Sequence, residues 1–160
     1  MLRPTTPDDT PALLALAEQT GVFQPFEVEG FAEVLEDYHD EEQYNGHFAF
    51  TWEEDGVVTG FVYFAPADLT DGTWDLWWII VAKARQGRGL GARLLDLVEQ
   101  SVRQEGGHQL LIETSSLPQY EPTRRFYLKF GYQVVARIPD YYAVGDDLII
   151  YVKRITPPVA

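Results

Sequence analysis

Three apolar runs separated by two turn signals, in residues 47–82, are the feature that most constrains how this chain folds. The segment reads HFAFTWEEDGVVTGFVYFAPADLTDGTWDLWWIIVA, and its runs are separated by Asp55-Gly56 and Asp71-Gly72. Aspartate followed by glycine readily adopts the positive φ angles that tight hairpin turns require. The pattern therefore predicts an antiparallel meander of three strands.

Helical and strand patterns flank this meander. Apolar residues at helical spacing predict helices over residues 8–20, 28–38, 90–105 and 120–130. Shorter apolar runs predict a strand at the N-terminus and strands over residues 109–114, 132–138 and 147–154. The predicted order is β, α, α, β, β, β, α, β, α, β, β, which is an α/β (α+β) arrangement. The 160 residues contain no repeat and no linker, so we expect a single domain over residues 1–160.

Charge is distributed unevenly along the chain, whose net charge is -13. Residues 1–82 hold 17 carboxylates and only Arg3 as a cation, whereas residues 83–129 hold eight cations and five carboxylates. So acidic a chain is not expected to bind nucleic acid. A basic segment within it favours a bound polyanion there, and the acidic remainder either attracts a cationic substrate or only aids solubility.

Composition excludes several other classes of protein. The chain is 46% hydrophobic and has no apolar stretch long enough to cross a bilayer, so we expect a soluble globular protein without a membrane partner. The N-terminus lacks a signal-peptide pattern, which favours the cytoplasm. Without cysteine there is no thiolate nucleophile. The scattered His39, His47 and His108 do not form a metal site by spacing, and we expect each at the surface.

A glycine-rich segment, ARQGRGLGARLL, follows the last apolar run of the meander and opens a helical pattern. Glycines before a helix let an anion approach the backbone N–H groups, so this segment predicts an anion site. Gly87, Gly89 and Ala92 also fit the fingerprint of a dinucleotide-binding fold, with Glu113 near the ribose-binding spacing. The late position of the segment, after a meander and with little chain following, argues against that fold.

The wider segment IIVAKARQGRGLGARLL resembles the cofactor motif of the GCN5-related N-acetyltransferases (GNAT family), with Gln86, Gly89 and Gly91 on its Q/R-x-x-G-x-G/A pattern. The segment YEPTRRFYLKFGY resembles the second motif of that family, and the predicted order of elements is the family's order. The resemblance implies a mixed sheet of about six or seven strands flanked by about four helices. It also implies an N-acetyltransferase that uses acetyl-coenzyme A and no metal.

Cofactor-binding positions follow from the same resemblance. The strand before the loop would pair its backbone with the pantetheine arm, the loop would hold the pyrophosphate, and the second motif would touch the cofactor arm. Arg88 and Arg93 are expected to neutralise phosphate charge, while Lys83 and Arg85 either do so at the rim or are ordinary solvated cations. The implied positions are Ile79, Ile80, Val81, Gln86, Gly87, Arg88, Gly89, Leu90, Gly91, Ala92, Tyr120 and Thr123. Tyr120 and Thr123 depart from the asparagine and alanine that many members carry there.

Catalytic candidates are fewer. Tyr127 occupies the family position for the acid that protonates the leaving thiolate, and we favour that role for it over core packing, which explains Phe126 and Phe130 in the same helix. Asp75 and Glu113, at strand ends, are candidate general bases, and either is otherwise a solvent-exposed strand-end residue. The acceptor pocket is predicted from aromatic residues and from a loop beside it, DYYAVGDD, and comprises Phe26, Trp77, Tyr141 and Tyr142.

The sequence thus predicts direct acetyl transfer to a primary amine, without a covalent enzyme adduct. The acidic character favours a cationic small molecule as the acceptor, and a peptide or protein amine is the other choice. The main alternative is a binding module that senses acyl-coenzyme A without turnover. A homodimer is left open.

Overall fold

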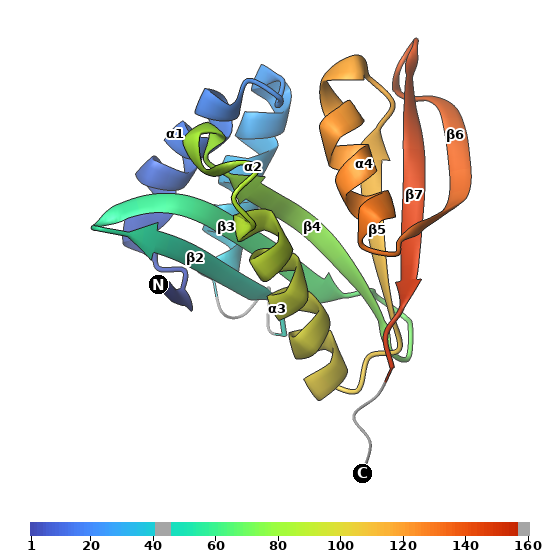
Figure 1. The fold of residues 1–160 in the computed structure, drawn as a ribbon, viewed down its shortest axis with the longest axis horizontal. Coiled ribbons are helices and arrows are strands. Elements are labelled where there is room, and N and C mark those ends of the chain that lie inside the picture. Colours follow the sequence, from blue (N-terminus) through green and yellow to red (C-terminus); the bar gives the residue numbers. More distant parts are fainter. Residues whose placement is uncertain (41–45, 157–160) are drawn as a thin grey trace. The chain divides into compact units, whose positions relative to one another are not determined.

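The protein is described by a computed structural model that covers residues 1–40 and 46–156 (Figure 1). These residues form a seven-stranded mixed sheet with strand order β1-β2-β3-β4-β5-β7-β6, together with four helices. The chain forms two compact units, one made of residues 1–65 and 78–98 and the other of residues 66–77 and 99–160. The predicted order of elements is confirmed throughout.

The predicted meander forms, and the first of its two turns has the expected chemistry, whereas the second connection spans residues 67–72 and only Gly72 of Asp71-Gly72 has a positive φ, of 93°. Strand β2 (Phe48–Glu54) pairs antiparallel with β3 (Val57–Pro66), and Glu54 lies opposite Val57. The two-residue turn between them places Asp55 at φ 50° and Gly56 at φ 77°. Two consecutive positive φ angles match the right-handed twist of a hairpin, so this turn fixes the register of the two strands. The meander ends with β4 (Thr73–Val81), and β1 (Leu2–Pro4) pairs with β2 at the other edge.

Helices cover both faces of this part of the sheet (Figure 1). Residues 61–65 of β3 are fully buried. Phe61 and Tyr63 pack in one cluster with residues of α1 (Thr10–Thr20) and α2 (Pro25–Tyr38). On the opposite face, α3 (Leu90–Gln104) lies against Gly60. The alternation of side chains along β3 therefore supplies two apolar faces, each covered by helix.

The first two helices start two and three residues away from the predicted positions. Residues 7–9 form a 3₁₀ turn, so α1 begins at Thr10 and not at residue 8. Helix α2 begins at Pro25, three residues before the predicted Val28. Proline suits the first position of a helix because its missing N–H has no intrahelical partner there. The proline therefore marks the helix start, whereas the apolar spacing marks only the part that packs.

The second unit is a sheet with one covering helix. Strands β5 (Gln109–Ser115), β7 (Asp146–Arg154) and β6 (Gln133–Ala143) lie in that order, and β5 also pairs in parallel with the start of β4. Helix α4 (Glu121–Lys129) follows a 3₁₀ turn and supplies the buried Tyr127. Strand β6 continues past the predicted end at residue 138, because Ala143 still pairs with Asp146 across the hairpin.

The three histidines, expected at the surface, are half-buried, and each keeps part of its side chain exposed. His47 Nδ1 hydrogen-bonds with the Tyr63 hydroxyl at 2.5 Å. His108 Nε2 hydrogen-bonds with the carbonyl oxygen of Asp71 at 2.9 Å. Burial lowers the pKa of His39 below its ordinary value.

Within the described residues, no group of histidine and acidic side chains is arranged to hold a metal. A search of the helices in the same residues finds no candidate membrane span.

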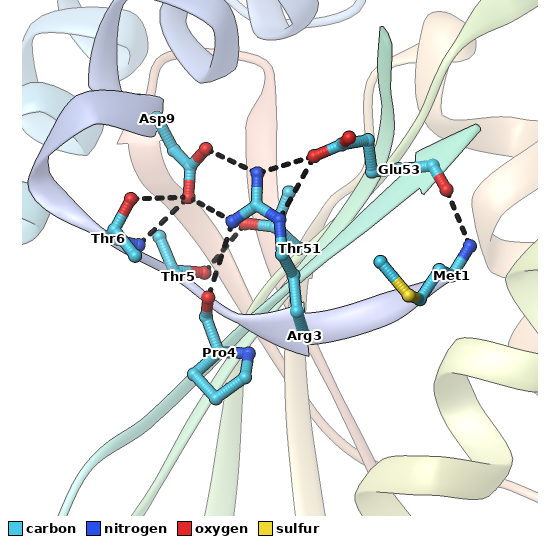
Figure 2. Close-up of polar contacts among 8 residues, drawn as sticks. All are labelled: Met1, Arg3, Pro4, Thr5, Thr6, Asp9, Thr51 and Glu53. Carbon is cyan, nitrogen blue, oxygen red and sulfur yellow. Dashed lines mark hydrogen bonds and ion pairs between the residues drawn. The ribbon is translucent and has the colours of Figure 1, made fainter. Parts of the chain in front are cut away.

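An ion-pair network ties the N-terminal strand to the first unit (Figure 2). The Arg3 guanidinium lies between two carboxylates, donating to Asp9 in a bidentate pair at 2.8 Å and to Glu53 at 2.8 Å. Asp9 is buried and also accepts the Thr6 N–H at 2.8 Å. The hydrogen bonds from Arg3 hold the pKa of Asp9 below its ordinary value of 3.8. A bidentate pair of this kind is stronger than a typical surface salt bridge.

Asp9→Asn is expected to lower the free energy of unfolding at pH 7 by about 2 kcal/mol, because Arg3 and the Thr6 N–H lose a charged acceptor. Since the pKa of Asp9 is lowered by folding, its contribution is present above about pH 3.8 and is lost as the pH falls further. Urea unfolding at pH 7 and pH 3 measures both effects. Asp8→Asn, at an exposed neighbouring carboxylate, is the control and is expected to change little. An equal loss in both variants would contradict this role of Asp9.

Candidate functional site

The loop between β4 and α3 adopts a conformation that depends on glycine. Gly87 has φ 75° and Gly89 has φ 86°, values that residues with a Cβ atom rarely adopt. A Cβ built at either position meets no atom within 4 Å, so the glycines are required by backbone geometry and not by crowding. Residues 86–89 are exposed, and Gln86 Nε2 donates to the Val81 carbonyl oxygen at 3.2 Å. The loop is thus open on its outer side.

Close packing of α3 on the sheet fixes where this loop lies. A Cβ at Gly60 of β3 would come within 3.1 Å of Leu94 and 3.3 Å of Leu90, so any other residue there would require these side chains to shift. Leu90 is the first residue of α3 and is already buried. The first N–H groups of a helix have no intrahelical partners and carry its positive dipole end. The exposed glycine loop therefore ends at a helix terminus suited to an anion.

The four cations near the loop differ in their partners. Arg85 Nε pairs with Glu54 Oε2 of β2 in a partly exposed ion pair, so a carboxylate compensates its charge. Arg93 lies over the ring of Trp52 at 5.9 Å, which is a cation–π contact. Lys83 and Arg88 are exposed and form no ion pair with any described residue. Arg93 likewise forms no ion pair with a described residue, so Arg85 alone of the four is compensated by a described carboxylate.

Other positions predicted in the first unit have mainly packing roles for their side chains. Ile80 is 2% exposed and packs in the cluster under α1 and α2, while Ile79 and Val81 are half-buried. Phe26, in the first turn of α2, is 56% exposed. The predicted backbone role of residues 79–81 concerns their N–H and C=O groups and stays a prediction.

Tyr127 lies in an aromatic cluster of the second unit. It is 3% exposed, and its ring centroid is 5.9 Å from that of Tyr132 and 5.8 Å from that of Tyr151. Burial, and to a smaller extent Tyr151, raises the pKa of Tyr127 far above its ordinary value of 10.0. The hydroxyl therefore keeps its proton at neutral pH and can act as a hydrogen-bond donor. Tyr120 is buried in the turn before α4, and Thr123 is half-buried.

Two carboxylates lie on one face of the second unit. Asp75 of β4 is opposite Leu111 of β5, and Glu113 follows Leu111 by two residues, so it points to the same face. Asp75 is half-buried, whereas Glu113 is exposed, and Trp77 on the same strand face is 41% exposed. Burial raises the pKa of Asp75, and the charges of Glu113 and Asp68 raise it further. Asp75 is therefore a stronger base than an isolated carboxylate.

The segment DYYAVGDD belongs to the β6–β7 hairpin and is held by polar contacts of Asp140 and Asp147. The Asp140 N–H donates to Asp147 Oδ1 at 2.9 Å, and the Gly145 N–H donates to Asp140 Oδ1 at 2.7 Å. Tyr141 and Tyr142 are 54% and 40% exposed, with ring centroids 5.0 Å apart in an edge-on arrangement. The predicted loop is therefore partly strand, with two tyrosines facing solvent.

The predicted site residues divide between the two units. The glycine loop, residues 79–81 and Phe26 belong to the first, and Asp75, Trp77, Glu113, Tyr127, Tyr141 and Tyr142 belong to the second. Sequence reasoning missed Glu54 and Trp52, which hold Arg85 and Arg93, and Tyr151, which packs on Tyr127. The only sequence signal for Glu54 and Trp52 is the hairpin turn that follows them, since it places the end of β2 beside β3.

A comparison with known proteins gives the family. The model of the acetyltransferase (GNAT) family matches residues 13–132. A protein of the GNAT acetyltransferase family from Desulfovibrio desulfuricans is 36% identical, with a TM-score of 0.90 over 98% of this chain and 99% of its own. The chain belongs to the GNAT acetyltransferase family.

Two more distant solved structures share the GNAT fold. The ribosomal-protein-S18-alanine N-acetyltransferase of Escherichia coli is 19% identical, with a TM-score of 0.77 over 99% of this chain and 96% of its own. An aminoglycoside 6'-N-acetyltransferase solved with coenzyme A is 20% identical, with a TM-score of 0.75 over 100% of this chain and 99% of its own. No curated protein matches the chain significantly.

Membership of the GNAT family confirms the predicted fold class and excludes the dinucleotide-binding fold that the glycines also fitted. The meander that precedes the glycine loop is the physical reason, since a dinucleotide fold places its fingerprint in a series of parallel strands.

Glu113→Gln is expected to lower the pKa of Asp75 toward its ordinary value of 3.8, because one of the two charges that raise it is removed. Asp68→Asn is expected to lower it less, since its effect is the smaller. Carboxyl-carbon NMR titration measures both changes. Glu121→Gln, on the exposed side of α4, is the control and should leave the pKa unchanged. An unaltered titration of Asp75 in Glu113→Gln would show that the two carboxylates are not coupled.

Proposed function

We propose that this GNAT protein transfers an acetyl group from acetyl-coenzyme A to a primary amine. The observation that carries the proposal is the exposed glycine loop at the start of α3, with Gly87 and Gly89 at positive φ. The loop offers backbone N–H groups and a helix terminus to a pyrophosphate, and Lys83 and Arg88 add unpaired cations within the described residues. The relative solved with coenzyme A supports the same donor.

The two units have different tasks in this proposal. The first unit binds the donor through the loop of residues 86–92 and through the backbone of residues 79–81. The second unit supplies the groups that move protons. Tyr120 and Thr123, which precede Tyr127 in the chain, contact the pantetheine arm in the proposal.

Transfer proceeds through a tetrahedral intermediate. The lone pair of a neutral amine forms the N–C bond to the thioester carbonyl, whose π electrons move to oxygen, and their return breaks the C–S bond and expels the thiolate. The nitrogen loses its proton to a base, and the sulfur ends as a thiol, so the products are an amide and coenzyme A. Tyr127 donates its hydroxyl hydrogen toward the sulfur as negative charge develops there.

The raised pKa of Tyr127 bears on how far this proton moves. A thiol has a pKa of about 8.5, well below that of the buried phenol, so complete transfer from Tyr127 to the thiolate is uphill in this environment. We therefore assign Tyr127 chiefly to stabilising the leaving sulfur by a charge-assisted hydrogen bond. The transfer of a proton from Tyr127 to the sulfur is completed only when the phenolate that remains takes up another proton.

The acceptor proposed is a cationic amine. An alkylamine is protonated at pH 7 and must lose a proton before it attacks. Asp75 is the better base of the two candidates, because its pKa is raised and it is half-buried. Trp77, Tyr141 and Tyr142 expose aromatic surface that would contact the acceptor. The names of the two distant relatives specify N-acetylation, of a protein alanine and of an aminoglycoside, which supports an amine acceptor for this chain.

Thiol release from acetyl-coenzyme A tests the proposal directly. A panel of polyamines, aminoglycosides and short peptides with free amino termini is incubated with the protein, and calorimetry records donor binding in parallel. Release with one amine class supports the proposal and identifies the acceptor. Donor binding without release from any amine would instead favour a sensor of acyl-coenzyme A.

Gly89→Asp is expected to abolish binding of coenzyme A, because it adds bulk and negative charge where the pyrophosphate would lie. Calorimetric titration measures the affinity. Gly106→Asp is a matched control, because Gly106 has φ 82° and equally open surroundings but lies outside the loop. Both variants carry the same backbone strain, so only the loop variant should lose the cofactor. Unchanged affinity in Gly89→Asp would overturn the assignment of the loop.

Tyr127→Phe is expected to leave coenzyme A binding intact and to reduce turnover by about 10²-fold, because the leaving sulfur loses its hydrogen-bond donor. Thiol release at saturating donor measures the rate. Tyr132→Phe is the control, since its ring packs on Tyr127 and its buried hydroxyl has no partner within the described residues. Equal turnover in Tyr127→Phe and wild type would return Tyr127 to a packing role.

A further inference from the structure

A groove runs along the outer side of α4 in the second unit, and its walls differ in chemistry from the rest of this acidic protein. It lies between α4 and the hairpin strands, and Figure 1 shows α4 and β6 on either side of β7. Its volume is about 320 Å³, within the range of small-molecule sites. We call it the α4–β6 groove; its lining residues are Glu121, Arg124, Arg125, Leu128, Val134, Arg137, Ile149 and Tyr151.

The floor of the α4–β6 groove is apolar. Ile149 and Tyr151 of β7 are 7% and 2% exposed and form its base. Leu128 of α4 and Val134 of β6 stand at opposite rims, and each is 52% exposed. Large aliphatic side chains that remain half-exposed around a hollow gain free energy when an apolar ligand covers them.

Charge in the groove does not cancel. Arg125 pairs with Glu121 at 2.7 Å, and Arg137 pairs with Asp147 at 2.8 Å, so these two cations are compensated. Arg124 donates only to neutral carbonyl oxygens, through Nη1 to Ser115 at 2.8 Å and to Leu117 at 2.9 Å. It forms no ion pair with any residue in the described part of the chain. One half-buried positive charge therefore remains in the groove.

The hydrogen-bonding groups of Arg124 also remain partly free. Both of its bonds use Nη1, which leaves Nε and Nη2 without partners in the described ranges. Its charge acts on the floor, where it opposes the rise in pKa that burial causes in the Tyr151 hydroxyl. A guanidinium edge with two free nitrogens matches the two oxygens of a carboxylate.

We propose that the α4–β6 groove binds a monocarboxylate with an apolar body. One uncompensated cation selects one negative charge, and the aliphatic rims and floor select an apolar chain or ring. At about 30 Å³ per non-hydrogen atom, the volume accommodates a ligand of about ten such atoms. This site is formed by the second unit alone, so the proposal does not depend on the proposed acetyltransferase reaction.

Octanoate is the probe, titrated calorimetrically into the full chain in the presence of excess coenzyme A. Coenzyme A occupies the donor site, so that octanoate does not bind there as an acyl mimic. We expect one site with a Kd of about 0.1–1 mM, as the ligand efficiency of so small a molecule allows. Octanamide has the same shape without the charge, and its affinity is expected to be lower than that of octanoate by at least about 10-fold.

Leu128→Glu tests the location, because it places a carboxylate at the exposed rim of the groove without disturbing the core. Its affinity for octanoate should fall about 10-fold or more by like-charge repulsion. Val57→Glu, at a residue 61% exposed in the first unit, is the matched control and should bind as wild type does. Arg124→Gln should abolish the preference of the groove for octanoate over octanamide, whereas Arg125→Gln should preserve it.

These outcomes decide the proposal. Binding that prefers octanoate and is lost in Leu128→Glu alone establishes the site. No heat of binding up to about 10 mM octanoate, equal affinity for octanamide, or equal loss in Leu128→Glu and Val57→Glu would each overturn it.

Discussion

Burial of β3 on both faces is the constraint on which the first unit depends. Residues 61–65 expose no surface, so the strand requires an apolar cover above and below the sheet. Helices α1 and α2 cover one face, and α3 covers the other. Because Gly60 lets α3 approach closely, the N-terminus of that helix is fixed at the edge of the core. The glycine loop is held in place from its C-terminal end, although its own residues are exposed.

Local chemistry explains what could be predicted of this fold. The turn at Asp55-Gly56 depends on the φ preferences of two residues, and a hairpin follows from them without knowledge of the rest of the chain. The extension of β6 to Ala143 could not be predicted, because Pro139 interrupts the strand pattern and the pairing partner, Asp146, lies across a turn. The start of α2 was missed because apolar spacing reports packing, whereas Pro25 alone marks the first turn.

The candidate site shows the same division between local and distant causes. Positive φ at Gly87 and Gly89 follows from residue type, so the loop could be predicted. The ion pair of Arg85 with Glu54 joins residues 31 positions apart, and nothing near either residue indicates it. The Glu54 carboxylate compensates Arg85, whereas Lys83, Arg88 and Arg93 form no ion pair with any described residue. Such pairings depend on strand register, which a single sequence gives only through the turns that set it.

The aromatic cluster of the second unit bears on why Tyr127 is a tyrosine. Tyr127, Tyr132 and Tyr151 pack together almost without exposure, and phenylalanine would fill the same space. Among the described residues, the Tyr132 hydroxyl is fully buried without a partner, whereas the Tyr127 hydroxyl is not such an atom. Burial strongly raises the pKa of the Tyr127 hydroxyl, which therefore stays a hydrogen-bond donor at neutral pH. A bound thioester would offer this donor an acceptor, because its sulfur carries most negative charge as it leaves. The hydrogen bond would then be strongest in the transition state, which is where such an interaction accelerates transfer.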